Sequence, residues 1–315
     1  MSNIKRILLL PHIKVHNANA LSSPFTIGFP AMTAWLGAVH ALQRKLNESG
    51  FQTIKFISTG VVSHQCDLQT HRGVDDYVHS IIGTGNPLDK TGARSAFIEE
   101  ARCHLDISLV IEFVGIDKEQ EQLVKDKVNH LLHRMKIAGG DILDFRSPEF
   151  FKIEESVPKD IRTLTRKLMP GYALIERRDL MSKAMQNGKD AMDALLDYLT
   201  VHHRCTQPES TESDSQVTWK SFRKEKGWLV PIATGFQGLT ELGQAKNQRD
   251  PDTPHRFAES VVTLGQFKMP HKIQSINDIL WSYQADIKNN LYLCSQGKME
   301  QTKTSTEDAL AAFFN

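Results

Sequence analysis

The chain has 315 residues, 40% of them apolar and 24% charged, and a formal net charge of +1. The length allows one large or two medium domains with a sizeable core, and the near-neutral charge excludes a polycation. No apolar run approaches the roughly 20 residues of a membrane span, and the run at residues 7–10 is too short for a signal peptide. The four cysteines are widely spaced, which is typical of free thiols in the cytoplasm.

The first half of the sequence predicts an ordered series of elements. Leu105 to Phe113 alternate between apolar and polar residues, as in a half-buried strand, and Pro30 suits the first turn of a helix. A polar stretch, Asn17 to Pro24, predicts a loop. The predicted order is strand, helix, strand, strand, helix, strand, at residues 6–13, 30–50, 53–62, 105–113, 117–135 and 142–145.

This order predicts an α+β protein with a ferredoxin-like βαββαβ core, the arrangement of RNA-recognition motifs. Residues 65–104 are too long for an ordinary connection between two strands and predict an extruded arm or long hairpin. The predicted organisation is a core over 1–155 with the arm inserted at about 65–104, followed by a mixed α/β region over 156–315 that packs on the core.

The second half is less regular. Its predicted helices cover 159–168, 190–201, 257–264 and 276–283, and its predicted strands cover 172–175 and 228–232. Residues 206–216 are polar and acidic and predict a mobile surface loop, and 298–308 predict a polar tail.

Catalytic signatures are lacking in the sequence, and no cofactor is expected. His202, His203 and Cys205 lie too close along the chain to converge easily on one ion, so no metal is expected and a solvated helix end is favoured. His12, His16 and Lys14 leave acid–base cleavage of RNA open, although single histidines at a strand end are more often structural.

Basic clusters are more informative. Arg162 and Arg166 are four residues apart, so they share a helix face with Lys167 nearby and can follow a phosphate backbone, although a solvated helix face explains them equally well. A second cluster interleaves basic and aromatic residues, which suits a single nucleic-acid strand, but a solvated face with core tryptophans is the favoured alternative. It comprises Trp219, Lys220, Phe222, Arg223, Lys224, Lys226 and Trp228.

The polar stretch after the first strand is a third candidate. Asn17, Asn19, Ser22 and Ser23 can hydrogen-bond base edges or phosphates without adding charge, although turn capping is the favoured interpretation on their spacing alone.

Motifs along most of the chain, in the same order, resemble the family of the second subunit of the type I-F CRISPR surveillance (Csy) complex, a Cas-five-type branch of the RAMP superfamily. The resemblance rests on segments at 8–11, 17–24, 28–30, 37–42, 86–88, 99–105, 168–171, 227–232, 249–257 and 278–281. It implies a non-catalytic subunit with a ferredoxin-like core and an inserted thumb.

The resemblance also implies partners: the 5′ handle of the CRISPR RNA, the large subunit, the terminal backbone subunit and, through the assembled complex, double-stranded target DNA. The expected RNA-binding residues are Asn17, Asn19, Ser22, Ser23, Arg94, Arg102, Arg162, Arg166, Lys167 and Arg256. The rival interpretation is a metal-independent RNA-processing endoribonuclease, as in some relatives from other CRISPR subtypes.

Overall fold

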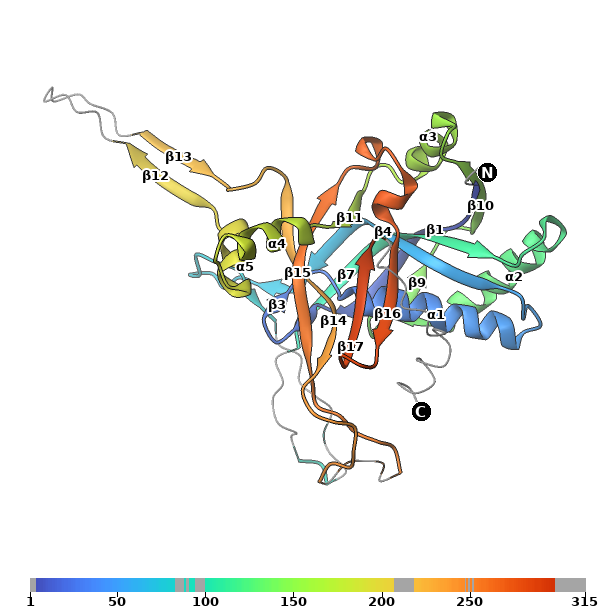
Figure 1. The fold of residues 1–315 in the computed structure, drawn as a ribbon, viewed down its shortest axis with the longest axis horizontal. Coiled ribbons are helices and arrows are strands. Elements are labelled where there is room, and N and C mark those ends of the chain that lie inside the picture. The colour runs from blue at the N-terminus through green and yellow to red at the C-terminus, as the bar shows by residue number, and fades with distance from the viewer. Residues whose placement is uncertain are drawn as a thin grey trace, which may run out of the picture.

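A computed structural model describes residues 4–82, 88, 91–93, 100–206, 218–246, 248, 250 and 252–297. The described chain is a mixed α/β structure with five α-helices around an eleven-stranded sheet whose recorded pairings are all antiparallel (Figure 1). None of the described helices is both long and apolar enough to cross a membrane.

The N-terminal half supplies one end of this sheet. Its strands are β1 (Ile4–Asn19), β4 (Lys55–Leu68), β7 (Arg102–Val114) and β9 (Gly140–Asp144), which lie in the order β4-β7-β1-β9. The short β8 (Lys136–Ile137) extends the edge beside β9, and β10 (Glu149–Glu154) pairs with the start of β1.

Two helices cover one face of these strands, α1 (Met32–Glu48) and α2 (Glu121–Leu132), the latter preceded by η1 (Lys118–Gln120). The buried residues of α1 recur at helical spacing, and its Trp35 is fully buried and donates its indole N–H to Pro30 O at 3.1 Å. Alternate residues of β7, among them Leu105 and Ile107, join the same core cluster.

The opposite face of the strands is divided into two parts. Near the N-terminal end of β1, Ile7 and Leu9 pack with Val110 in a second apolar cluster, under α3 (Pro158–Lys167), η2 (Pro270–Lys272) and η3 (Ile276–Ile279). Farther along, the residues of β7 on this face become polar and only partly buried. This second part, which includes Arg102, His104 and Asp106 of β7, is termed the polar face.

The second half of the chain continues the sheet from β4 and curls back to it. Its strands are β11 (Tyr172–Glu176), β14 (Trp228–Gly238), β15 (Ala258–Lys268), β16 (Trp281–Asp286) and β17 (Leu291–Gln296). They follow β4 in the order β16-β17-β14-β15-β11, and β11 pairs with β4 again at Ala173 and Val62. Trp281 is fully buried and donates its indole N–H to Leu174 O at 3.0 Å, which ties β16 to β11.

Two helices, α4 (Arg178–Gln186) and α5 (Ala191–Leu199), pack on β14 and β15 in a third apolar cluster. Beyond them β12 (His202–Thr206) and β13 (Thr218–Phe222) form a two-stranded ribbon that projects away from the body of the molecule (Figure 1).

Most predicted elements of the first half are confirmed, but the loop predicted at residues 17–24 is wrong. β1 continues to Asn19, and β2 (Leu21–Ser23) and β3 (Thr26–Ile27) form a small hairpin after it. His12 and Asn17 have positive φ angles of 51° and 60°, within the two register shifts between β1 and β7. These bulges accommodate extra residues, so the strand continues where the polar sequence indicated that it ended.

Two predicted helices are also wrong. Residues 257–264 lie mostly in β15, because the β-branched residues Val261, Val262 and Thr263 pair with β14. Residues 276–283 form only the short η3, followed by β16. The predicted helices around Arg166 and Leu195 are confirmed as α3 and α5.

The segment predicted as the arm begins within β4, which extends to Leu68, and ends within β7, which begins at Arg102. Within it, β5 (Thr70–His71) and β6 (Ser80–Ile81) form a short ladder. Residues 83–87, 89–90 and 94–99 of the arm lie outside the described residues, and so do 207–216 of the predicted mobile loop and the whole predicted tail.

Candidate nucleic-acid interface

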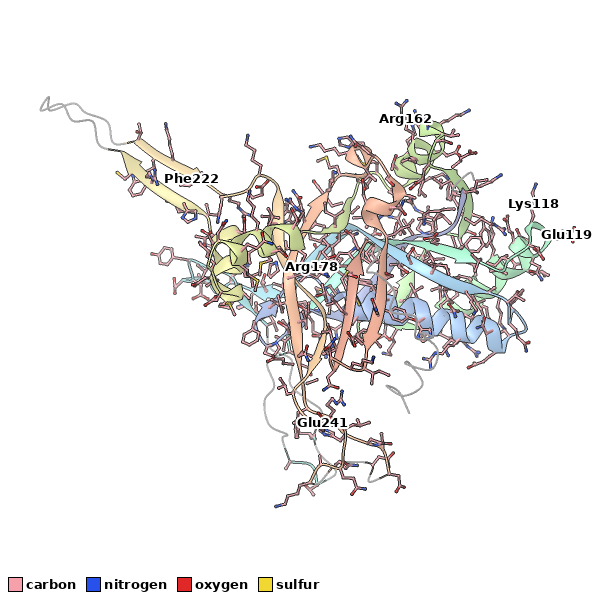
Figure 2. The ribbon with its side chains drawn as sticks, viewed as in Figure 1. Lys118, Glu119, Arg162, Arg178, Phe222 and Glu241 are labelled. Carbon is pink, nitrogen blue, oxygen red and sulfur yellow. The ribbon has the colours of Figure 1, made fainter. Side chains whose placement is uncertain are left out.

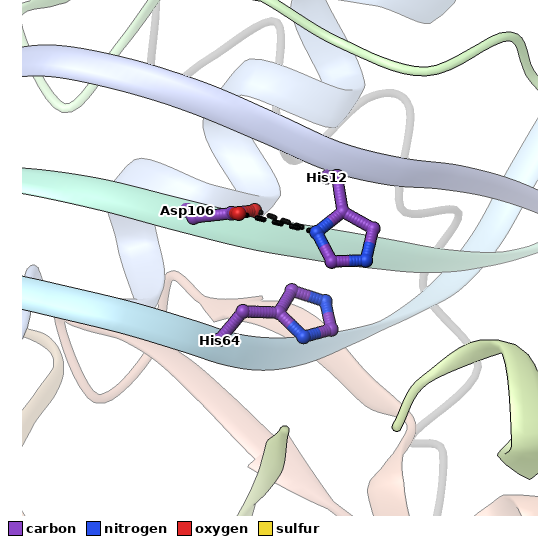
Figure 3. Close-up of side chains that lie close together, drawn as sticks. All are labelled: His12, His64 and Asp106. Atoms are coloured by element: carbon purple, nitrogen blue, oxygen red, sulfur yellow. Dashed lines mark hydrogen bonds and ion pairs between the residues drawn. The ribbon is translucent and has the colours of Figure 1, made fainter. Parts of the chain in front are cut away.

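Four side chains from three strands form a hydrogen-bonded network on the polar face, and Figure 3 shows three of them, His12, His64 and Asp106. His12 of β1 places Nδ1 3.1 Å from both carboxylate oxygens of Asp106 on β7. The His12 ring stacks on His64 of β4, with centroids 4.0 Å apart. Ser108 of β7 accepts the backbone N–H of His12 at 3.0 Å, which holds the bulge of β1 against β7.

The hydrogen bonds of His64 define its protonation. Its Nδ1 lies 2.5 Å from Pro170 O, a group that can only accept, so Nδ1 carries the proton. Its Nε2 lies 2.7 Å from Ser108 Oγ and accepts the hydroxyl proton. Burial lowers the pKa of His64 below its ordinary value, so the neutral ring is the stable form.

Three potential metal ligands meet in this network, since donor atoms of His12, His64 and Asp106 lie within 4.8 Å of one another. The two imidazole rings, however, are stacked with an interplanar angle of 20°. Their lone pairs therefore lie in two nearly parallel planes, whereas a metal ion must lie close to the plane of each imidazole ligand at about 2.0–2.1 Å. The arrangement suits a hydrogen-bonded support for β1 better than a metal site.

A second stacked histidine pair lies farther along the same face. The rings of His16 on β1 and His104 on β7 have centroids 4.4 Å apart, and His16 is exposed. Asn17 donates its backbone N–H to His104 Nδ1 at 3.2 Å, and its side-chain oxygen accepts from Gln69 at 3.0 Å. The bulge at Asn17 thus positions a flat, exposed ring among amide groups, which are chemical features that bind unstacked bases.

Arg102 borders this pair. It lies opposite Asn19 in the register of β1 and β7, and its guanidinium forms an ion pair with Glu100. Its Nε is buried and has no hydrogen-bond partner within the described part of the chain. Arg102 therefore adds a cation with an unused donor at the margin of the polar face.

The other predicted residues of this segment have local structural roles. Asn19 donates to Leu21 O at 3.1 Å and accepts the Leu21 N–H at 3.0 Å, so both ends of its amide close a turn. The hydroxyls of Ser22 and Ser23 lie 2.8 and 2.7 Å from that of Thr26 in the β2–β3 hairpin. The arrangement matches the turn-capping alternative for Asn19 and the two serines, whereas Asn17 faces the polar surface.

The predicted basic residues do not gather at one site. Arg162 and Arg166 are exposed on α3, away from the buried Ile161 and Leu164, and Figure 2 shows Arg162 on the outer side of that helix. Lys167 is paired with Glu149 at 2.9 Å. Elsewhere, Arg256 donates to Asn290 Oδ1 at 2.7 Å near the start of β15, and Arg94 lies outside the described residues.

His64, Gln69, His104, Asp106 and Ser108 were not among the predicted site residues. The alternation of Arg102, His104, Asp106 and Ser108 along one strand was the available signal, since all four fall on the face opposite the apolar core. The sheet order and the bulges decide which other strands contribute to that face. The sequence alone reveals neither of them.

The interpretation of residues 202–205 as a solvated helix end is wrong, because His202, His203 and Cys205 belong to β12. The preference for core tryptophans is wrong as well: Trp219 is 67% exposed and Trp228 is 52% exposed.

Comparison with known proteins agrees with the order of motifs in the sequence. A family model described as CRISPR-associated protein (Cas_Csy2) matches residues 8–294. The CRISPR-associated protein Csy2 of Pseudomonas aeruginosa (strain UCBPP-PA14) is 34% identical over 309 residues, covering 91% of this chain and 94% of that protein. The chain therefore belongs to the Csy2 family of CRISPR-associated proteins.

Proposed function

We propose that the chain is a non-catalytic subunit of the type I-F CRISPR RNA-guided surveillance complex and that it binds the 5′ handle of the CRISPR RNA. Membership of the Csy2 family over nearly the whole chain supports the assignment to such a complex.

The polar face of β1, β4 and β7 is the observation that carries the RNA-binding part of the proposal. It presents the stacked pair of His16 and His104, the amides of Asn17 and Gln69, and the cation of Arg102. Single-stranded RNA is recognised through stacking on flat side chains and hydrogen bonds to base edges, with cations at the phosphates. The three kinds of group required therefore occur together on one part of the sheet.

The same proposal includes a ferredoxin-like core of the RAMP type over residues 1–155, with its arm at about 65–104 and a second region at 156–315. The order β4-β7-β1-β9, with α1 and α2 packed against one another on one face, supports this arrangement. In RNA-recognition motifs the face of the sheet opposite the two helices binds the RNA, and here the histidines lie on that face, beside the part that α3 covers.

The proposed partners follow from this assignment. They are the large subunit, the terminal backbone subunit and, through the assembled complex, double-stranded target DNA, all in the cytoplasm. The exposed cations of α3, Arg162 and Arg166, are proposed to contact the phosphates of the RNA.

An endoribonuclease is the second candidate, and the His12–Asp106 pair is the observation that favours it. An imidazole oriented by a carboxylate is a typical general base. Here, however, the neighbouring Ser108 is fully buried, and both nitrogens of His64 are already hydrogen-bonded. Incubation of the purified protein with unprocessed repeat RNA and a chelator tests the point: intact RNA supports the non-catalytic assignment, and site-specific cleavage that is lost in His12→Ala contradicts it.

The RNA-binding proposal is tested with a double variant, His16→Ala with His104→Ala, assembled with its partner subunits. We expect weaker retention of handle RNA by the complex, with unchanged subunit composition. Lys118→Ala is the matched control, because Lys118 is exposed beside α2, away from the polar face. Equal retention by the double variant and the control would remove the histidine pair from the RNA path.

A further inference from the structure

The ribbon formed by β12 and β13 has features that the proposed handle-binding face does not use. The described strands pair mainly with one another, and every residue of β13 is exposed. An isolated two-stranded hairpin is marginally stable in water. A ribbon that projects in this way therefore gains stability when a partner covers one of its faces.

The register places basic and aromatic side chains together on one face of the ribbon. His202 pairs with Phe222 and Arg204 pairs with Lys220, so these four side chains point to the same side. The His202 ring stacks on Phe222 with centroids 5.3 Å apart, and the Arg204 guanidinium lies 5.5 Å from the centre of the Phe222 ring. Phe222 is nevertheless 43% exposed, so part of its ring remains accessible to a ligand.

A cavity of about 230 Å³ lies at the root of this ribbon. Its lining includes three lysines, Lys183, Lys189 and Lys224, together with Asn187, Tyr198 and one carboxylate, Glu225.

Asp197 organises two of these lysines. Its Oδ2 accepts from Lys189 at 2.6 Å and also from Lys224. Lys224 additionally lies 4.5 Å from the centre of the Tyr198 ring. The cavity and its rim thus carry three ammonium groups, those of Lys183, Lys189 and Lys224, against the two carboxylates of Asp197 and Glu225, and this excess of positive charge favours an anion.

The two features are continuous, because Lys224 lies only two residues after Phe222. Residues 202–206 and 218–226, which form the two strands of the ribbon and the segment after them, carry five cations and one carboxylate: Arg204, Lys220, Arg223, Lys224, Lys226 and Glu225.

We propose that the Arg204–Lys220–Phe222 face of the ribbon and the lysine-rimmed cavity bind a single nucleic-acid strand separate from the RNA on the polar face of the sheet. Phe222 stacks with a base, Arg204 and Lys220 contact phosphates, and a further phosphate lies at the rim of the cavity. Exposed aromatic rings between cations are the chemistry that single strands require, because bases need flat partners and phosphates need charge.

The test uses the assembled complex already loaded with its RNA and fluorescein-labelled probes: a single-stranded DNA, an RNA of the same sequence and the corresponding duplex. Binding is measured at several salt concentrations for Phe222→Ala and for Lys220→Glu. Trp219→Ala is the matched aromatic control, since Trp219 lies on the opposite face of the ribbon. Lys118→Glu is the matched charge control, at the opposite side of the molecule in Figure 2.

We expect Phe222→Ala to weaken binding of a single strand about 5- to 150-fold, the usual range for one lost base–aromatic stack. Lys220→Glu should weaken it and reduce the salt slope by at least the roughly 0.7 of one phosphate contact. Comparison of the affinities for the single-stranded DNA and RNA probes shows which kind of strand is bound. Unchanged affinity for all probes would overturn the proposal. A second outcome would also overturn the proposal: the variants lose a subunit from some complexes, while the complexes that remain intact bind the probes with normal affinity. The ribbon would then be a protein-docking element.

Discussion

Removing one cation from α3 should have a measurable effect that differs from removing a neutral contact. Arg166 is exposed, and no ion pair with a described carboxylate is recorded for it, whereas the neighbouring Lys167 is 2.9 Å from Glu149. A contact between Arg166 and a phosphate therefore neutralises that phosphate without first breaking an internal ion pair. Arg166→Ala should remove one phosphate contact and leave the apolar face of α3 intact, because Ile161 and Leu164 are unchanged.

The magnitude follows from counterion release. One contact on a single strand contributes roughly 0.7 to the slope of log K against log salt. Raising the salt from about 50 to 200 mM should thus weaken the original chain about 2.6-fold more than the Arg166→Ala variant. Fluorescence anisotropy of handle RNA with the assembled complex measures both slopes, and Lys118→Ala is the charge control. An unchanged slope in Arg166→Ala would refute the assignment of α3 to the RNA path.

Three further predictions concern other parts of the chain. Asn19→Ala should lower the free energy of unfolding by about 0.5–1.5 kcal/mol without changing RNA preference, because its amide closes a turn on Leu21; altered preference in a binding competition would contradict this. Trp281→Phe should cost about 1–3 kcal/mol in chemical denaturation, since the Leu174 carbonyl loses a buried donor, while Trp219→Phe should change little. Because the pKa of His64 is lowered in the folded chain, the unfolded chain binds a proton at this residue first when the pH falls below about 6.5, and the free energy of unfolding should decrease. The measurement is the difference in the free energy of unfolding between the original chain and His64→Gln as a function of pH. A difference that does not change with pH would contradict the prediction.

Local pattern was sufficient to predict the elements with strong periodicity. The alternation around Leu109 predicted β7, and the apolar spacing around Trp35 and Leu36 predicted α1. The pattern failed at β15, where apolar residues at helical spacing are also β-branched and pair with β14. A segment whose residues fit both a helix and a strand takes the structure that its neighbours in the fold impose. A single sequence does not show which neighbours those are.

The candidate site was only partly predictable for the same reason. The sequence identified Asn17 and the first-strand histidines as polar groups, and Arg102 through a motif. The contacts between His12, His64 and Asp106 depend on three strands separated by up to 94 residues and on the positive φ at His12. Because of the bulges, β1 continues through the segment predicted as a loop. Asn19 therefore lies at the end of a strand and not in a loop.

The central claim is that this subunit holds the 5′ handle of the CRISPR RNA on the polar face of its sheet. Its most direct test is photocrosslinking of the assembled complex with handle RNA that carries 4-thiouridine, followed by mass spectrometry of the crosslinked peptides. We expect crosslinks to peptides containing residues 12–19 of β1 and residues 102–108 of β7. Handle crosslinks found only on other subunits, with these two peptides recovered unmodified, would contradict it.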